Sequence, residues 1–134
     1  MLKRFTRAAV FALALVALGG RSAHADTITV TTGPDPTEDV PLAVMVGWTS
    51  GSTDQHVFVT IKPAGPLGCA ASYAADEPVS EDLISRWTDS VAGTRSGTAM
   101  EDAPGTYILC GYLQSGPFAS VPAAMTGPVL VTLR

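Results

Sequence analysis

The sequence predicts an antiparallel β-sandwich, and three observations carry this prediction. Short segments in which apolar and polar residues alternate recur along the chain, as in TITVT at 27–31 and PLAVMVGWT at 41–49. Clusters of Gly, Pro, Ser and Asp separate these segments, as is typical of turns between strands. No long segment has its apolar residues at the spacing of an amphipathic helix.

Seven strands and one helical turn are expected. The strands are predicted at 27–32, 41–49, 56–62, 69–74, 91–99, 105–114 and 128–134. The segment SEDLISRW at 80–87 predicts a helical turn, because its first serine can cap it and two acidic residues suit its positive end. Leu83, Ile84 and Trp87 would then share one face of that turn.

Residues 1–25 have the layout of a secretory signal peptide. Three basic residues precede an apolar run at 8–18, and the small-x-small triplet at 23–25 marks the expected cleavage point. The apolar run is shorter than the roughly 20 residues that a transmembrane helix needs. We therefore expect a cleaved leader and a single secreted or periplasmic domain of residues 26–134.

The charge of this domain disfavours two classes of partner. Residues 26–134 contain four basic and twelve acidic side chains, which gives a net charge of −8. Such a surface repels phosphate backbones and anionic lipids. Neither nucleic acid nor a membrane surface is an expected partner.

Cys69 and Cys110 are the only cysteines of the chain. An even count in an exported domain favours a disulfide, and closing a loop of about 42 residues would stabilise the fold by roughly 4 kcal/mol. A metal site would need more ligands than two thiols and His56, which is the only histidine after residue 25. We predict a structural disulfide and no cofactor.

The segment GTYILCGYL at 105–113 resembles the F strand of immunoglobulin-like sandwiches, where a glycine, a tyrosine and a disulfide cysteine mark the corner before the strand. Similar stretches occur in small secreted bacterial domains with an immunoglobulin-like or fibronectin type III-like fold. Tyr107 lies three residues before Cys110, so their side chains should point to opposite faces. Cys69 follows the third predicted strand and Trp48 lies in the second. The resemblance therefore implies an immunoglobulin-like sandwich without antibody topology, and it implies no function.

The two longest predicted connections, 75–90 and 115–127, are candidates for recognition, because long loops on a rigid sandwich often carry it. Their apolar residues are the candidate binding residues: Leu83, Ile84, Trp87, Phe118, Val121 and Met125. If Trp87 and Phe118 are exposed, we expect a binding or adhesion module for a protein or glycan at the cell surface. If they fold inward, they close the end of the sandwich.

Two other functions are kept as alternatives. A hydrophobic cleft between these connections would hold a small apolar ligand, as in the secreted immunoglobulin-like apoproteins that carry antibiotic chromophores, although those have two disulfides. A small hydrolase could use a carboxylate pair such as Glu81 and Asp82. No nucleophile-elbow, zinc-protease or phosphate-loop motif accompanies that pair, so we expect a non-enzymatic domain.

Five acidic residues are candidates for a calcium site, because alternate loops of a sandwich gather at one end. These residues are Asp35, Glu38, Asp39, Glu101 and Asp102. Calcium takes about six to eight oxygen ligands from loops, but the compact D-x-D-x-D-G pattern is missing here. Charged loop tips that keep the domain soluble are the simpler interpretation.

Overall fold

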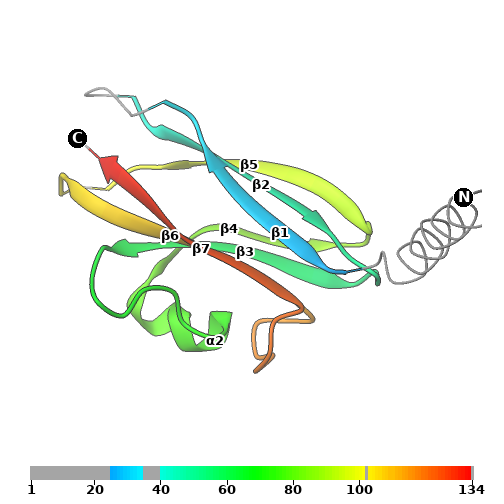
Figure 1. Ribbon diagram of the computed structural model, residues 1–134. Coiled ribbons are helices and arrows are strands. Elements are labelled where there is room, and N and C mark those ends of the chain that lie inside the picture. Colours follow the sequence, from blue (N-terminus) through cyan, green and yellow to red (C-terminus); the bar gives the residue numbers. More distant parts are fainter. Residues whose placement is uncertain (1–24, 35–39, 102, 134) are drawn as a thin grey trace, which may run out of the picture.

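The fold was analysed in a computed structural model that describes residues 25–34, 40–101 and 103–133 (Figure 1). The expected signal peptide lies outside the described residues, apart from Ala25. So do four of the calcium candidates, Asp35, Glu38, Asp39 and Asp102. Within the described ranges, no helix is long and apolar enough to span a bilayer.

The described residues form seven strands in two antiparallel sheets (Figure 1). The strands are β1 Thr27–Thr32, β2 Leu42–Thr49, β3 Gln55–Pro63, β4 Glu81–Thr88, β5 Ala92–Ala99, β6 Gly105–Gln114 and β7 Ala124–Leu133. The three-stranded sheet has the order β1-β2-β5, and the four-stranded sheet has the order β4-β3-β6-β7. The predicted all-β sandwich is confirmed.

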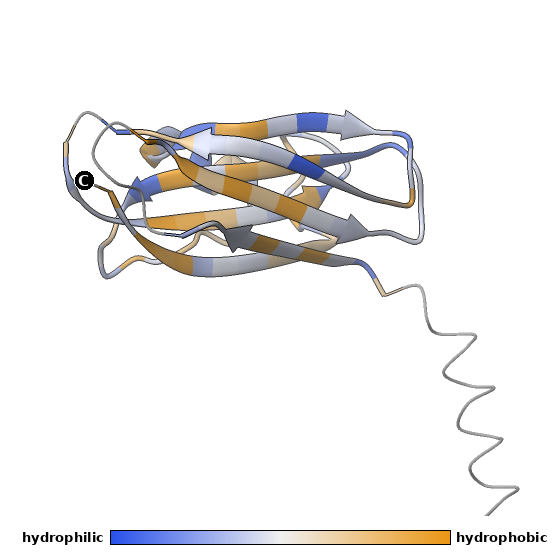
Figure 2. Ribbon diagram, turned by 90° about the horizontal axis from the view of Figure 1, so that it is seen from above, coloured by the Kyte–Doolittle hydropathy of each residue, from blue (hydrophilic) through white to orange (hydrophobic). Residues whose placement is uncertain are grey.

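The main core lies between the two sheets and is built from alternate residues of each strand. On β2, the side chains of Leu42, Val44, Val46 and Trp48 are buried and their neighbours are more exposed. Figure 2 shows the resulting apolar bands across the strands. Burying each such side chain contributes about 1.5–3 kcal/mol, so this alternation is the main driving force for stacking the sheets.

Strand β5 is rich in glycine because large side chains of neighbouring strands fill the space beside it. A Cβ atom on Gly93 would lie 2.6 Å from Cζ2 of Trp48, and one on Gly97 would lie 3.1 Å from Cγ1 of Ile84. Glycine has low strand propensity, so β5 is held in the sheet by this packing and by its pairing with β2.

The predicted strand at 69–74 is wrong. The chain instead forms a short helix, α2 (Tyr73–Asp76), followed by the 3₁₀ helix η1 (Glu77–Val79). The hydroxyl of Ser72 accepts a hydrogen bond of 3.3 Å from the Ala75 N–H, which caps the start of α2. Local capping thus outweighs the short apolar pattern of this segment.

The predicted helical turn at 80–87 is also wrong, because this segment is strand β4. It pairs with β3 from Gln55 opposite Thr88 to Ile61 opposite Glu81. Pairing satisfies backbone groups along one side of β3 that would otherwise lie open, and this outweighs the local preference for a helix. Ser80 does not begin a helix: its hydroxyl donates to the Asp76 carbonyl at 2.8 Å.

Strand β7 begins at Ala124, earlier than the predicted start at 128, because a bulge carries it through the Gly-Pro pair. Leu109 pairs with Val129, whereas Gly111 pairs with Thr126. The proline is tolerated because β7 is an edge strand. Gly127 has a φ of 111°, and a Cβ there would lie 2.6 Å from the Leu109 carbonyl oxygen, so only glycine fits.

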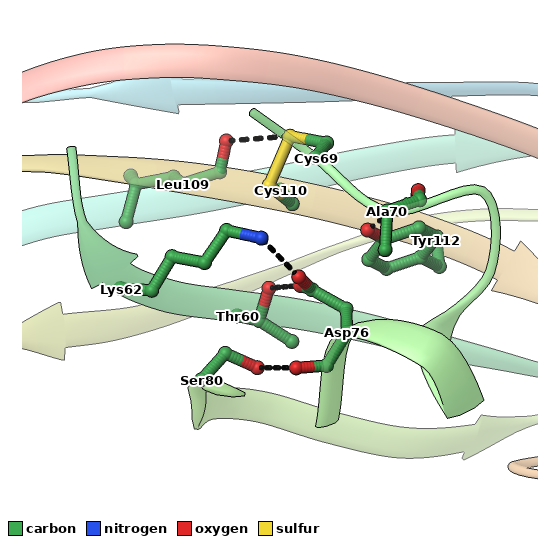
Figure 3. The surroundings of a disulfide bond; sticks show 9 residues. All are labelled: Thr60, Lys62, Cys69, Ala70, Asp76, Ser80, Leu109, Cys110 and Tyr112. Atoms are coloured by element: carbon green, nitrogen blue, oxygen red, sulfur yellow. Dashed lines mark hydrogen bonds and ion pairs between the residues drawn. A yellow bond between two sulfur atoms is a disulfide. The ribbon is translucent and has the colours of Figure 1, made fainter. Parts of the chain in front are cut away.

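The predicted disulfide between Cys69 and Cys110 is confirmed, with its Cα atoms 5.7 Å apart. Cys110 lies on the outer face of β6, and the bond ties the connection after β3 to that face (Figure 3). Tyr107 belongs to the main core, so it and Cys110 point to opposite faces as predicted. The Tyr107 hydroxyl donates to the Ala103 carbonyl at 2.6 Å, which braces the corner before β6.

Replacing both cysteines by alanine is expected to lower the free energy of unfolding by roughly 4 kcal/mol, because the unfolded chain regains the freedom of the closed loop. Urea denaturation of the wild type and the double variant measures this difference. A loss below about 1 kcal/mol would show that the disulfide contributes little beyond the contacts around it.

Candidate functional site

The two central strands of the four-stranded sheet are buried on both faces. Strand β3 is buried from Gln55 to Lys62, and β6 from Tyr107 to Gln114. Their inward residues belong to the main core. Their outward residues form a second cluster with a tyrosine of α2: Phe58, Tyr73, Ile108, Cys110 and Tyr112. The connection between β3 and β4, residues 64–80, covers this outer face.

A buried ion pair holds the covering connection in place (Figure 3). The carboxylate of Asp76 in α2 is fully buried, and it pairs with the Lys62 ammonium of β3 at 2.5 Å. The Thr60 hydroxyl donates to its other oxygen at 2.5 Å. A buried carboxylate is tolerated only with such partners, so this contact fixes α2 over β3.

A row of stacked rings runs along the outer face from α2 to the edge strand β4. The Tyr73 ring stacks on Phe58 with centroids 3.6 Å apart, and Phe58 stacks on His56 at 3.9 Å. His56 in turn meets Trp87 of β4 at 4.7 Å in a tilted arrangement. The row begins under the covering connection and ends at Trp87, whose surface is 59% exposed.

One buried side chain links the covering connection to the β6–β7 loop. Gln114 is fully buried at the end of β6. Its amide nitrogen donates to the Gly116 carbonyl at 2.6 Å, and its amide oxygen accepts from the Tyr73 N–H at 3.4 Å. The two connections are therefore fastened to the same residue, which lies opposite His56 in the sheet.

The β6–β7 loop lies against Trp87. The Ala119 N–H donates to the Gly116 carbonyl at 3.2 Å, which closes a turn, and a Cβ on Gly116 would lie 3.7 Å from the Trp87 ring. Phe118, inside this turn, is 91% exposed. Sequence analysis did not identify Gly116 or Gln114 as supports, because both act through contacts with residues far away in the sequence.

Four of the six predicted binding residues are exposed on this part of the molecule: Trp87, Phe118, Val121 and Met125. We call these four residues the aromatic end. Met125 pairs with Tyr112 and thus shares the outer face of the sheet. Leu83 and Ile84 lie apart from these four residues, because on strand β4 Ile84 is buried in the main core and Leu83 is partly buried against it. The alternation of β4 turns Ile84 inward, whereas a helical turn would have grouped it with Trp87.

The five calcium candidates lie mostly outside the described residues. Of the five candidates only Glu101 is described. Leu42 pairs with Ala99, so the β1–β2 and β5–β6 connections do leave neighbouring strand ends. Within the part of the chain that the structure describes, no three His, Cys, Asp or Glu residues are grouped as metal ligands would be.

Comparisons of the chain with protein families, curated proteins and solved structures find no match. The chemistry of the aromatic end follows from its own side chains. These offer two aromatic rings, a thioether and a branched aliphatic side chain. Such a surface suits an apolar protein patch or the face of a sugar ring.

Burial shifts the pKa values of three rings on the outer face. It lowers the pKa of His56 from its usual 6.5, and the negative charge of Asp82 opposes this shift only in part. Burial raises the pKa of the Tyr73 hydroxyl, which also donates to Asp82 at 2.7 Å. It raises the pKa of Tyr112 as well, with a further contribution from Asp76. These tyrosines therefore remain protonated and neutral.

The lowered pKa of His56 predicts a pH-dependent stability. His56 takes up a proton more readily in the unfolded chain than in the folded one. Its contribution to the free energy of unfolding is therefore fully present above pH 6.5 and is lost as the pH falls below that value. His56→Gln should remove this component. Urea denaturation at several pH values between about 5 and 7.5 compares the two proteins. Parallel pH profiles would contradict the assignment to His56.

Removing one partner of the buried ion pair should cost far more than removing both. Lys62→Met leaves the Asp76 carboxylate buried without its counter-ion and is expected to lower the free energy of unfolding by about 3–5 kcal/mol. Adding Asp76→Leu should restore most of this loss, because no buried charge remains. Urea denaturation of the single and double variants tests this, and a double variant no more stable than Lys62→Met would refute it.

Proposed function

We propose that residues 26–134 form a secreted or periplasmic, non-enzymatic module that recognises a protein or glycan at a cell surface through the aromatic end. One observation carries the proposal. Phe118 is 91% exposed and Trp87 is 59% exposed, although strand β4 with Trp87 and the loop with Phe118 are fastened to the covered sheet face. Export is supported by the predicted signal peptide and by the disulfide.

The aromatic end has the features of a binding surface. A few large side chains carry most of the binding energy of many protein interfaces, and tryptophan is common among them. Trp87 is backed by His56, and the Phe118 turn is fastened through Gly116 to Gln114. Little conformational entropy is then lost when a partner binds. Exposed rings contribute little to the free energy of unfolding, so recognition of a partner is the role that this arrangement supports.

We infer that the sandwich is closer to the fibronectin type III-like arrangement than to the antibody constant type. In constant-type domains the fourth strand joins the sheet of the first, second and fifth strands. Here β4 pairs with β3 in the other sheet. This strand order supports the resemblance to small secreted bacterial sandwich domains, in which the scaffold carries its recognition site on connections at one end.

A small-ligand carrier is the second candidate. An apolar hollow of about 220 Å³ lies beside the covering connection, lined by residues that include Pro63, Leu67, Val79 and Ile108. It is smaller than the roughly 300 Å³ of typical ligand pockets, and it differs from the predicted cleft between the two recognition connections. The hydrolase alternative has less support, because Glu81 and Asp82 are successive residues of β4 and their carboxylates point to opposite sides.

The proposal is tested by cross-linking and affinity capture from the envelope and medium of the producing cell, with residues 26–134 as bait. Trp87→Ala and Phe118→Ala should each reduce capture of the specific partner by tenfold or more, on the order expected for interface anchors. Leu67→Ala is the matched control, because Leu67 is 87% exposed but lies in the connection after the opposite end of β3.

Each variant is first shown to unfold at the same urea concentration as the wild type. Capture lost in all three variants, or retained in all of them, would remove the aromatic end as the binding surface. Absence of any partner with folded bait would favour the small-ligand carrier instead.

A further inference from the structure

The two sheets meet along one side of the sandwich at a pair of edge strands. Strand β4 pairs only with β3, and β5 pairs only with β2. The two edges approach closely near Gly97, where a Cβ would lie 3.1 Å from Cγ1 of Ile84 and 3.6 Å from the Leu83 carbonyl oxygen. This contact closes the interior of the sandwich on that side.

Next to this contact the strands border a hollow of about 500 Å³. Its lining comes from both strands, with four residues of β4 and two of β5: Leu83, Ile84, Ser85 and Arg86, then Arg95 and Ser96. The volume lies within the range of roughly 300–1,000 Å³ that small-molecule sites occupy. The hollow lies beside the aromatic end but shares none of its residues.

Both arginines occupy positions where a sandwich normally places apolar side chains. Arg86 pairs with Val57 and Arg95 pairs with Val46, and both valines are fully buried in the main core. Each arginine is therefore on the inward face of its strand, at the open margin of its sheet. From opposite sheets, the two arginines border the same hollow.

Neither guanidinium has a carboxylate partner among the residues that the structure describes, where the ion pair is that of Lys62 with Asp76. This is unusual in a domain with twelve acidic and four basic side chains. Two like charges that share one hollow repel each other, and an anion placed between them would relieve this repulsion.

We propose that this hollow is a binding site for an oxyanion of a ligand, with Arg86 and Arg95 as its two recognition residues. A carboxylate fits best, because the planar guanidinium fork donates two parallel hydrogen bonds to it. The site shares no residue with the aromatic end, so the two proposals are tested independently of each other.

Inward charges on edge strands also discourage edge-to-edge aggregation. That role explains one arginine on each strand, but it predicts no saturable binding of an anion. Binding measurements therefore separate the two explanations.

Citrate and inorganic phosphate are the probes, titrated calorimetrically into residues 26–134 at constant ionic strength. We expect saturable binding of citrate, weakened on the order of tenfold by Arg86→Gln or Arg95→Gln and lost in the double variant. Arg→Lys at either position keeps the charge without the fork and should weaken binding less. Trp87→Ala should bind citrate as the wild type does.

Saturation by phosphate alone, lost in the same variants, would also support the site and would assign it to phosphate or sulfate groups. No saturable binding of either probe, or equal binding by the double variant, would overturn the proposal. If a glutamine variant does not fold, the citrate and phosphate affinities of the lysine variants are compared with those of the wild type instead.

Discussion

The structure depends on the need to cover a second face of the four-stranded sheet. Its central strands β3 and β6 are buried on both sides, so stacking the two sheets satisfies only half of their apolar surface. The β3–β4 connection covers the rest, although its helix α2 has only four residues and would not be stable alone. The disulfide, the Lys62–Asp76 ion pair and the stacking of Tyr73 on Phe58 hold it there.

The same covered face gives the exposed rings their support. Trp87 is the last member of a row of stacked rings whose other members are buried, and the turn that contains Phe118 is bonded to a buried glutamine. A surface made of such groups keeps its shape without a ligand. The side on which β4 and β5 approach each other differs, because there two arginines of edge strands, and not packed rings, border the surface hollow.

Much of the scaffold could be predicted from residue patterns. The strands at 27–32 and 105–114 have the predicted bounds, since alternation and turn residues mark them clearly. The prediction of a helical turn at 80–87 was wrong, because the apolar residues of this segment fit both a helical face and a strand, and only the edge of β3 decides between them. The runs HVFV and YILC lack alternation, which is typical of strands buried on both faces, but the predicted sandwich did not include a covered outer face. Gln114 and Asp76 had no such signal, because their partners are distant in the sequence.

The disulfide also has a mechanical consequence. It closes a ring that contains β4 and β5, which belong to different sheets. If the domain is pulled at its ends, tension passes from β3 through the sulfur atoms to β6 and bypasses the residues between the cysteines. With 41 residues of separation, the stretched chain is shorter by about 140 Å than it would be without the bond. In a domain anchored at one end and loaded at the other, strands β4 and β5 would thus carry no tension along their backbone.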